Sequence, residues 1–298
     1  MFQLRNNNAQ IVTTFYKHIL GREPDAGGLA TYTALIQKVG IAEGAETMLK
    51  AFLGSPEYAI KLPKKNNSLV DGLDIAQRKL INGKKVSHVV SLGTHCLASS
   101  ILKKWNLKKY SMPFDWLFMS PSAITHCLEN DFEILLDRSF YKPFVAESGQ
   151  KKAEHLWYRE KHKVTSVFAH RDPTGEEDYR YFARAVDRFR TLARSRESAK
   201  LFVMISDTGH DIRKNFSELS QAVRSKVSNS ALICVQLTHE TGLPGCSSMR
   251  QIAQDGDHAL YEFTPSSTQA GLGFPEILDD LAVLRLIHQY DIELSPSI

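Results

Sequence analysis

The spacing of apolar residues changes once along the chain, at about residue 62. Before that point apolar residues recur every three or four positions, which predicts amphipathic helices, and no strand pattern is found. The predicted helices cover residues 11–20, 25–40 and 42–53, with Asp25 as the N-cap of the second and a glycine at each end, Gly21, Gly40 and Gly54. Residues 1–62 are therefore predicted to form a small all-α domain.

A charged and polar stretch separates this region from the rest of the chain. The sequence KLPKKNNS, residues 61–68, contains a proline and has the composition of an exposed connector. One more helix is predicted over residues 71–82, leading into a second domain that covers residues 70–298.

Beyond the connector, short apolar runs alternate with longer amphipathic ones. Near-continuous hydrophobicity predicts strands that are buried on both faces, at residues 88–92, 165–169, 201–205, 232–237 and 259–263. Amphipathic helices are predicted at residues 178–194 and 275–290. Strands interleaved with helices of this length indicate an α/β domain with a doubly wound, mostly parallel sheet of about five strands.

Composition and charge narrow the class of protein. The 298 residues are 43% hydrophobic and 23% charged, as in ordinary globular proteins, and a net charge of +4 does not favour nucleic acid as a partner. No apolar run has the length of a membrane span, and the first twenty residues show no signal-peptide pattern, so the expected location is the cytoplasm. The four cysteines form no CxxC pair and are expected to be free thiols, and no metal or cofactor is predicted.

The stretch VVSLGTHCLASSILKKW, residues 89–105, is the first candidate for chemistry. An apolar strand leads into Gly93 and a tight turn, and Cys96 then falls in the first turn of a helix. The N-terminus of a helix stabilises an anion, which predicts a reactive thiolate with a lowered pKa. Backbone N–H groups of residues 94–97 would receive an oxyanion, at the sheet edge where ligands bind in open α/β proteins. The alternative is a structural cysteine packed in the core.

A cysteine nucleophile needs a base, and the chain holds eleven histidines. His170 ends the predicted strand TSVFAH and should lie at the same carboxyl edge as Cys96. On a helix, the side chains of His95 and its neighbour Cys96 would point in different directions, so His95 is the poorer partner. His210, after the strand LFVMISD, is a third candidate. Taken singly, each is more commonly a surface histidine.

The segment SMPFDW, residues 111–116, has no regular pattern but carries two large aromatic residues and an acid. Phe114 and Trp116 would form the walls of a pocket around Asp115, which would orient a histidine or bind a substrate hydroxyl. The alternative for Asp115 is a turn acid that caps the next helix. Asp207, after the third predicted strand, has the same two interpretations.

Three motifs resemble a known family. SLGTHC at residues 91–96, YSMPFDWLF at 110–118 and FAH at 168–170 are similar to a bacterial family of unknown function catalogued as predicted papain-like cysteine peptidases, over about residues 86–240. The resemblance implies a site made of Ser91, Gly93, Cys96, residues 113–116 and His170. A papain-like fold packs its cysteine helix against an antiparallel half, whereas the predicted strands are nearer to GDS-type esterases and acyltransferases, whose Asp-x-x-His signature is absent.

A second resemblance covers residues 14–58. TFYKHILGREPDAGGLATY and FLGSPEY are similar to a helical domain of unknown function with the pattern LYxxxLGRxPDxxGLxxW, and Tyr32 stands where tryptophan is usual. That domain accompanies bacterial surface proteins and glycan-assembly enzymes, which implies a polysaccharide or cell-envelope setting.

The leading hypothesis is a thiol-dependent hydrolase or acyltransferase. Cys96 would attack a carbonyl, His170 would act as base and then acid, and Asp115 or Asp207 would orient the imidazole. The substrate, a glycan or a protein, would contact Ser91, Gly93, Thr94, His95, Phe114, Trp116 and Asp207. One alternative is a glycan-linked transferase or carbohydrate-binding protein that uses the same cleft without a covalent step. Another is a scaffold whose N-terminal helices recruit a protein partner.

Overall fold

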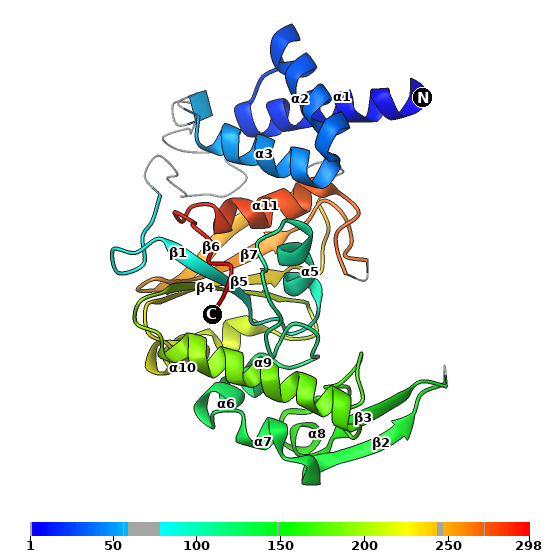
Figure 1. Ribbon diagram of the computed structural model, residues 1–298, viewed down its shortest axis with the longest axis vertical. Coiled ribbons are helices and arrows are strands. Elements are labelled where there is room, and N and C mark those ends of the chain that lie inside the picture. The colour runs from blue at the N-terminus through cyan, green and yellow to red at the C-terminus, as the bar shows by residue number, and fades with distance from the viewer. Residues whose placement is uncertain (1, 56, 59–77, 148, 243–246, 271) are drawn as a thin grey trace. The chain divides into compact units, whose positions relative to one another are not determined.

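The computed structural model of the chain describes residues 2–55, 57–58, 78–147, 149–242, 247–270 and 272–298 (Figure 1). The chain divides into two compact units, Met1–Arg78 and Lys79–Ile298. The predicted connector at 61–68 lies outside the described residues, as does most of the helix predicted at 71–82. The end of that predicted helix is not helical, because Lys79 and Ile81 instead form isolated bridges with Tyr290 and Lys84.

The first unit contains the predicted helices: α1 (Phe2–Leu20), α2 (Ala26–Val39) and α3 (Ile41–Leu53). Their apolar faces meet around buried aromatic rings. Phe52 packs edge-on against Phe15 and Tyr16, with ring centroids 6.5 and 4.7 Å apart. The helical periodicity of the sequence therefore identified the faces that form the core of this unit.

The turn LGREPDAGGL, residues 20–29, is explained by the contacts of its side chains. Asp25 caps α2, as predicted, by accepting a hydrogen bond from the Gly28 N–H at 2.7 Å. Arg22 pairs with Glu57, with Nε 2.5 Å from Oε1, and so joins the turn to the segment that follows α3. A Cβ atom on Gly28 would collide with the Tyr16 hydroxyl. These residues set how α1, α2 and the start of the segment after α3 pack together.

The second unit is built on a five-stranded sheet with the order β1-β4-β5-β7-β6. All neighbouring strands are parallel except β6, which runs antiparallel to β7 at the edge. The strands are β1 (Val86–Ser91), β4 (Ala199–Ser206), β5 (Ser230–Leu237), β6 (Ser248–Asp255) and β7 (His258–Thr264). The predicted α/β class with a mostly parallel sheet is confirmed.

Helices cover both faces of this sheet. α9 (Glu176–Arg194) and α10 (Phe216–Lys226) lie on one side, and α11 (Ile277–Ile287) lies on the other (Figure 1). α5 (Leu97–Lys104) is tied to α11, because Lys104 Nζ and the Trp105 ring N–H both donate to the buried Asp280 carboxylate, at 2.6 and 3.1 Å. The remaining elements are α6 (Pro121–Glu129), α7 (Glu133–Leu136), η1 (Arg138–Phe140), β2 (Tyr141–Val145), β3 (Lys151–His155), α8 (Leu156–His162) and η2 (Ile212–Lys214).

One predicted strand is wrong. Residues 165–169 form no strand, and only Phe168 makes a single antiparallel bridge, with Ala153 of β3. Val167 and Phe168 are apolar because their side chains are buried in the core from a loop, and a short apolar run does not distinguish this from a strand. The fifth strand is instead β6, whose mixed burial at the sheet edge gives it no continuous apolar run.

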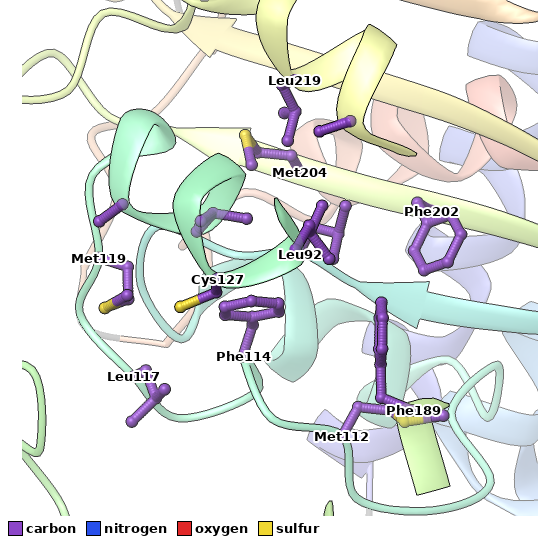
Figure 2. Packing of buried hydrophobic residues seen from close by; sticks show 14 of the residues in the cluster. Leu92, Met112, Phe114, Leu117, Met119, Cys127, Phe189, Phe202, Met204 and Leu219 are labelled. Atoms are coloured by element: carbon purple, nitrogen blue, oxygen red, sulfur yellow. The ribbon is translucent and has the colours of Figure 1, made fainter. Parts of the chain in front are cut away.

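The main core of the second unit lies between the sheet and the layer of α6, α9 and α10. Phe202 and Met204 from β4 meet Phe189 of α9 and Leu219 of α10 there, as Figure 2 shows. Cys127 and Cys234 are buried in the same cluster, and both are free thiols, as is Cys96. Cys246 lies outside the described residues. None of the helices among the described residues is long and apolar enough to cross a membrane.

Helix α6 depends on its N-cap. The Ser120 hydroxyl accepts a hydrogen bond from the Ala123 N–H at 3.2 Å, and Pro121 occupies the first helical position. We expect Ser120→Ala to lower the free energy of unfolding by about 1 kcal/mol, because this N–H then loses its acceptor. Urea unfolding followed by circular dichroism measures the difference, with Ser120→Thr as the matched variant that keeps the cap. Equal stability of the alanine and threonine variants would contradict the assignment.

Candidate functional site

The loop between β1 and α5 has a tight backbone that only glycine permits at one position. A Cβ atom on Gly93 would collide with the carbonyl oxygen of His95. The Gly93 N–H donates to the buried Ser91 hydroxyl at 3.2 Å. As a result of this turn, Cys96 occupies the N-cap position of α5. The sequence analysis had predicted it one residue further on, in the first turn of the helix.

The structure brings Cys96 and His170 together. Cys96 Sγ lies 3.1 Å from His170 Nε2, within hydrogen-bonding distance. The pairing predicted from the sequence is therefore present, although its stated reason was wrong, because His170 follows an irregular loop and ends no strand. The rings of Trp116 and Phe118 flank the imidazole, with centroids 6.2 and 6.0 Å from it.

The thiol does not have the lowered pKa that the sequence analysis predicted. Only 2% of Cys96 is exposed, whereas His170 is exposed at the surface. Burial raises the pKa of the Cys96 thiol to about 11; its own backbone N–H opposes this rise, the Asp115 carboxylate adds to it and Lys108 opposes it. Burial, and then the positive charge of Lys152, lower the pKa of His170. The loss of hydration thus outweighs the helix N-terminus, and the resting pair is a neutral thiol beside a neutral imidazole.

The raised thiol pKa predicts how reactivity depends on pH. A thiol with a pKa of about 11 is ionised in about one molecule in ten thousand at pH 7, and this fraction rises about tenfold per pH unit up to pH 10. Alkylation of Cys96 by iodoacetamide should rise with the same slope, because the thiolate is the attacking species. Mass spectrometry of the peptide that contains Cys96 gives the rate. A plateau below pH 8 would contradict the pKa assignment, and the fully buried Cys127 is the internal control that should stay unmodified.

Asp115 lies beside this pair but bonds to other groups. Its Oδ2 is 2.5 Å from Lys108 Nζ and accepts the Met112 N–H at 2.6 Å, and only 1% of the side chain is exposed. Burial raises the pKa of Asp115, and Lys108 opposes that rise. Among the described residues no hydrogen bond joins Asp115 to His170, so the predicted orienting role of Asp115 lacks a direct contact.

Lys108 is the site residue that the sequence analysis did not single out. Its Nζ donates to the Ser99 hydroxyl at 2.9 Å and lies 5.2 Å from the centre of the Trp116 ring, in addition to its pairing with Asp115. The sequence shows it only as one of several lysines near residues 103–109. A side chain that is 90% buried next to an acid is a property of the packing, so sequence spacing alone gives no signal for it.

The other predicted polar residues gather in a second group, at the carboxyl ends of β1 and β4. Asp207 Oδ1 lies 3.2 Å from His210 Nδ1, and this hydrogen bond lowers the pKa of Asp207. Thr94 donates to the Ile205 carbonyl at 3.2 Å and lies 3.1 Å from the ring of His95. The His95 ring also contacts the Gln269 amide. The bonds of Asp207 therefore lead to His210 and not to His170.

Phe114 corrects another prediction. The sequence analysis placed it in the wall of a substrate pocket, but it is completely buried in the main core (Figure 2). Its ring packs against those of Phe132 and Phe189. Trp116, the other residue of the predicted wall, is partly exposed, and its ring lies beside that of His170, with centroids 6.2 Å apart. The two aromatic side chains of SMPFDW therefore have different roles: Phe114 anchors the segment in the core, and Trp116 contacts the histidine of the site.

Comparisons with known proteins agree with both resemblances. The family model described as "Putative papain-like cysteine peptidase (DUF1796)" matches residues 87–235, which is half of the chain. The model described as "Domain of unknown function (DUF4214)" matches residues 2–62. No curated protein and no solved structure matches the chain. Cys96, Asp115 and His170 all fall inside the first of these ranges.

Proposed function

The chain belongs to the DUF1796 family, and on that premise we propose that it is a thiol-dependent hydrolase or acyltransferase with Cys96 as nucleophile and His170 as base. The observation that carries the proposal is the 3.1 Å separation between Cys96 Sγ and His170 Nε2. A neutral imidazole at this distance is ready to accept the thiol proton.

The neutral resting pair fixes the order of the steps. His170 Nε2 takes the proton from Cys96 as Sγ forms a bond to the carbonyl carbon of the substrate. The imidazolium then gives this proton to the leaving group as the carbonyl–heteroatom bond breaks, which leaves a thioester on Cys96. Water, or a hydroxyl of an acceptor molecule, then attacks the thioester carbonyl carbon and gives its proton to His170. The C–S bond breaks, the acid or the new ester leaves, and the imidazolium returns the proton to Sγ, which restores the neutral thiol. The lowered pKa of His170 keeps its ring neutral for the first step.

The surroundings of His170 support a cysteine–histidine pair that aromatic contacts position. Trp116 and Phe118 restrict the imidazole from two sides, where a catalytic triad would use a carboxylate. The buried Lys108–Asp115 pair lies close enough to Cys96 to act on its pKa in opposite directions. We assign Asp115 to this pair, where it holds Lys108 near the sulfur, and we place the oxyanion donors among the backbone N–H groups of residues 94–97.

The substrate is proposed to be an acyl group on a glycan or a protein. The N-terminal domain, which matches a family model over residues 2–62, is the basis for a cell-envelope or polysaccharide setting. If the alternative of non-covalent carbohydrate binding were right, the chain would function without the Cys96 thiol.

Trapping of the thioester tests the proposal. The full chain is mixed with p-nitrophenyl acetate, an activated ester, quenched in acid and digested, and the peptides are analysed by mass spectrometry. We expect an acetyl group on the peptide that contains Cys96, formed in the same time as the first equivalent of nitrophenol. Cys127 and Cys234, which are fully buried, provide the internal controls. Acetylation of surface lysines with none on Cys96 would overturn the proposal.

A further inference from the structure

A cavity of about 660 Å³ opens at the carboxyl ends of β4 and β5, and neither Cys96 nor His170 lines it. Its walls come from the start of α6, the end of α8, the loop between β4 and α10, and the end of β5 with the residues that follow it. The volume lies within the range of small-molecule binding sites. The carboxyl edge of a parallel sheet is also where open α/β proteins bind ligands.

The cavity is held open by a buried amide. Gln236, which is 2% exposed, accepts the Ile212 N–H at 2.8 Å and donates to the Asp207 carbonyl at 2.9 Å. These bonds fix both ends of the loop that forms one wall. Thr94, two residues before Cys96, joins the loop of the nucleophile to two segments beside the cavity. Its hydroxyl donates to the Ile205 carbonyl at the end of β4, and its carbonyl oxygen accepts the Met119 N–H just before α6. The cavity therefore adjoins the loop that carries the nucleophile and is preformed.

The lining is cationic. It contains three basic side chains of lysine and arginine and three imidazoles against one acid: Lys163, Arg213, Lys214, His162, His210, His239 and Asp211. Asp211 is already occupied, because it accepts two hydrogen bonds from the Arg213 guanidinium, at 2.8 and 3.2 Å. Within the described part of the chain no ion pair involves Lys163 or Lys214. Lys163 Nζ donates to the backbone carbonyl of Glu160 at 2.9 Å, and the pKa of Asp211 is lowered first by its hydrogen bond to Arg213 and also by the nearby charge of Lys214. Because neither lysine is held in an ion pair, both ammonium groups keep N–H donors for a ligand.

We propose that this cavity binds a phosphorylated small molecule through its phosphate groups. The argument depends on which base is available. Arg213, the bidentate partner that a carboxylate would favour, is taken by Asp211. The rings of His210 and His162 are bonded to Asp207 and Ser122, so the two lysines and the imidazole of His239 remain for a ligand. A phosphate has enough oxygens and charge to engage several such donors at once, and a single carboxylate does not. The proposal concerns a second ligand and is independent of the cysteine chemistry.

Calorimetric titration of the full chain with inorganic pyrophosphate tests this. We expect saturable binding with one site, which becomes about tenfold weaker or more in the double variant Lys163→Gln, Lys214→Gln, because two charged hydrogen bonds are lost. The matched control Lys38→Gln, Lys103→Gln removes the same charge from exposed lysines elsewhere and should leave the affinity unchanged. Circular dichroism confirms that each variant is folded.

Two results would overturn the proposal: heats that never saturate in the wild-type chain, or equal weakening in the control variant, which would indicate diffuse attraction by net charge. Cys96→Ala should bind pyrophosphate as tightly as the wild type. This variant separates the two proposals, because it removes the thiol chemistry and leaves the cavity lining intact.

Discussion

Cys96→Ala is expected to abolish thioester formation and the turnover that depends on it, and His170→Ala to slow turnover by about 10²- to 10⁴-fold. The first loss is complete because the bond to the acyl group is made by Sγ. The second is large because the thiol pKa is raised to about 11, so that without the imidazole little nucleophile exists at neutral pH. Release of nitrophenol from p-nitrophenyl acetate measures both rates, after subtraction of the reaction in buffer.

The pH profile separates the role of His170 as a base from a structural role. In His170→Ala the residual rate should climb with pH toward that of the wild type, because hydroxide ionises the buried thiol in place of the imidazole. Cys127→Ala and His18→Ala are the controls, since Cys127 lies in the core and His18 in the first unit. Full activity of Cys96→Ala, or a His170→Ala profile parallel to that of the wild type, would exclude this mechanism.

The part of the site that sequence could predict is the part encoded in local patterns. A strand, Gly93 and a helix start in succession fix where Cys96 lies, and three motifs in order point to His170 as its partner. The state of the sulfur was not predictable in this way. Cys96 is buried by packing around it, and its pKa responds to Asp115 and Lys108, which lie 19 and 12 residues away in the chain.

The fold shows the same division between local pattern and long-range packing. Buried strands such as β4 and β5 are continuous apolar runs and were found, and the helices of the first unit were found from their periodicity. Residues 165–169 have the same apolar character, but Val167 and Phe168 fill the core from a loop. The edge strand β6 is half polar because only one of its sides is covered, so no apolar run marks it.

Phe114→Ala is expected to lower the free energy of unfolding of the second unit by about 3–5 kcal/mol, the usual cost of emptying a fully buried phenylalanine site. The ring is 0% exposed and lies 5.4 Å from Phe132 and 6.4 Å from Phe189, between centroids. Neighbours this tightly packed cannot collapse into the space without moving α9. Urea unfolding followed by far-ultraviolet circular dichroism gives the change in free energy.

Trp116→Ala, two residues further on, is the matched variant that distinguishes anchoring from site contact. Because Trp116 is partly exposed and packs beside His170 and Lys108, its removal should cost far less stability than that of Phe114. It should instead lower the rate of acyl transfer, since the imidazole loses one of the two rings that restrict it. If Phe114→Ala kept its stability and lost activity, Phe114 would be a pocket residue after all. The two substitutions would then have exchanged their effects, and the assignment of the two side chains would be reversed.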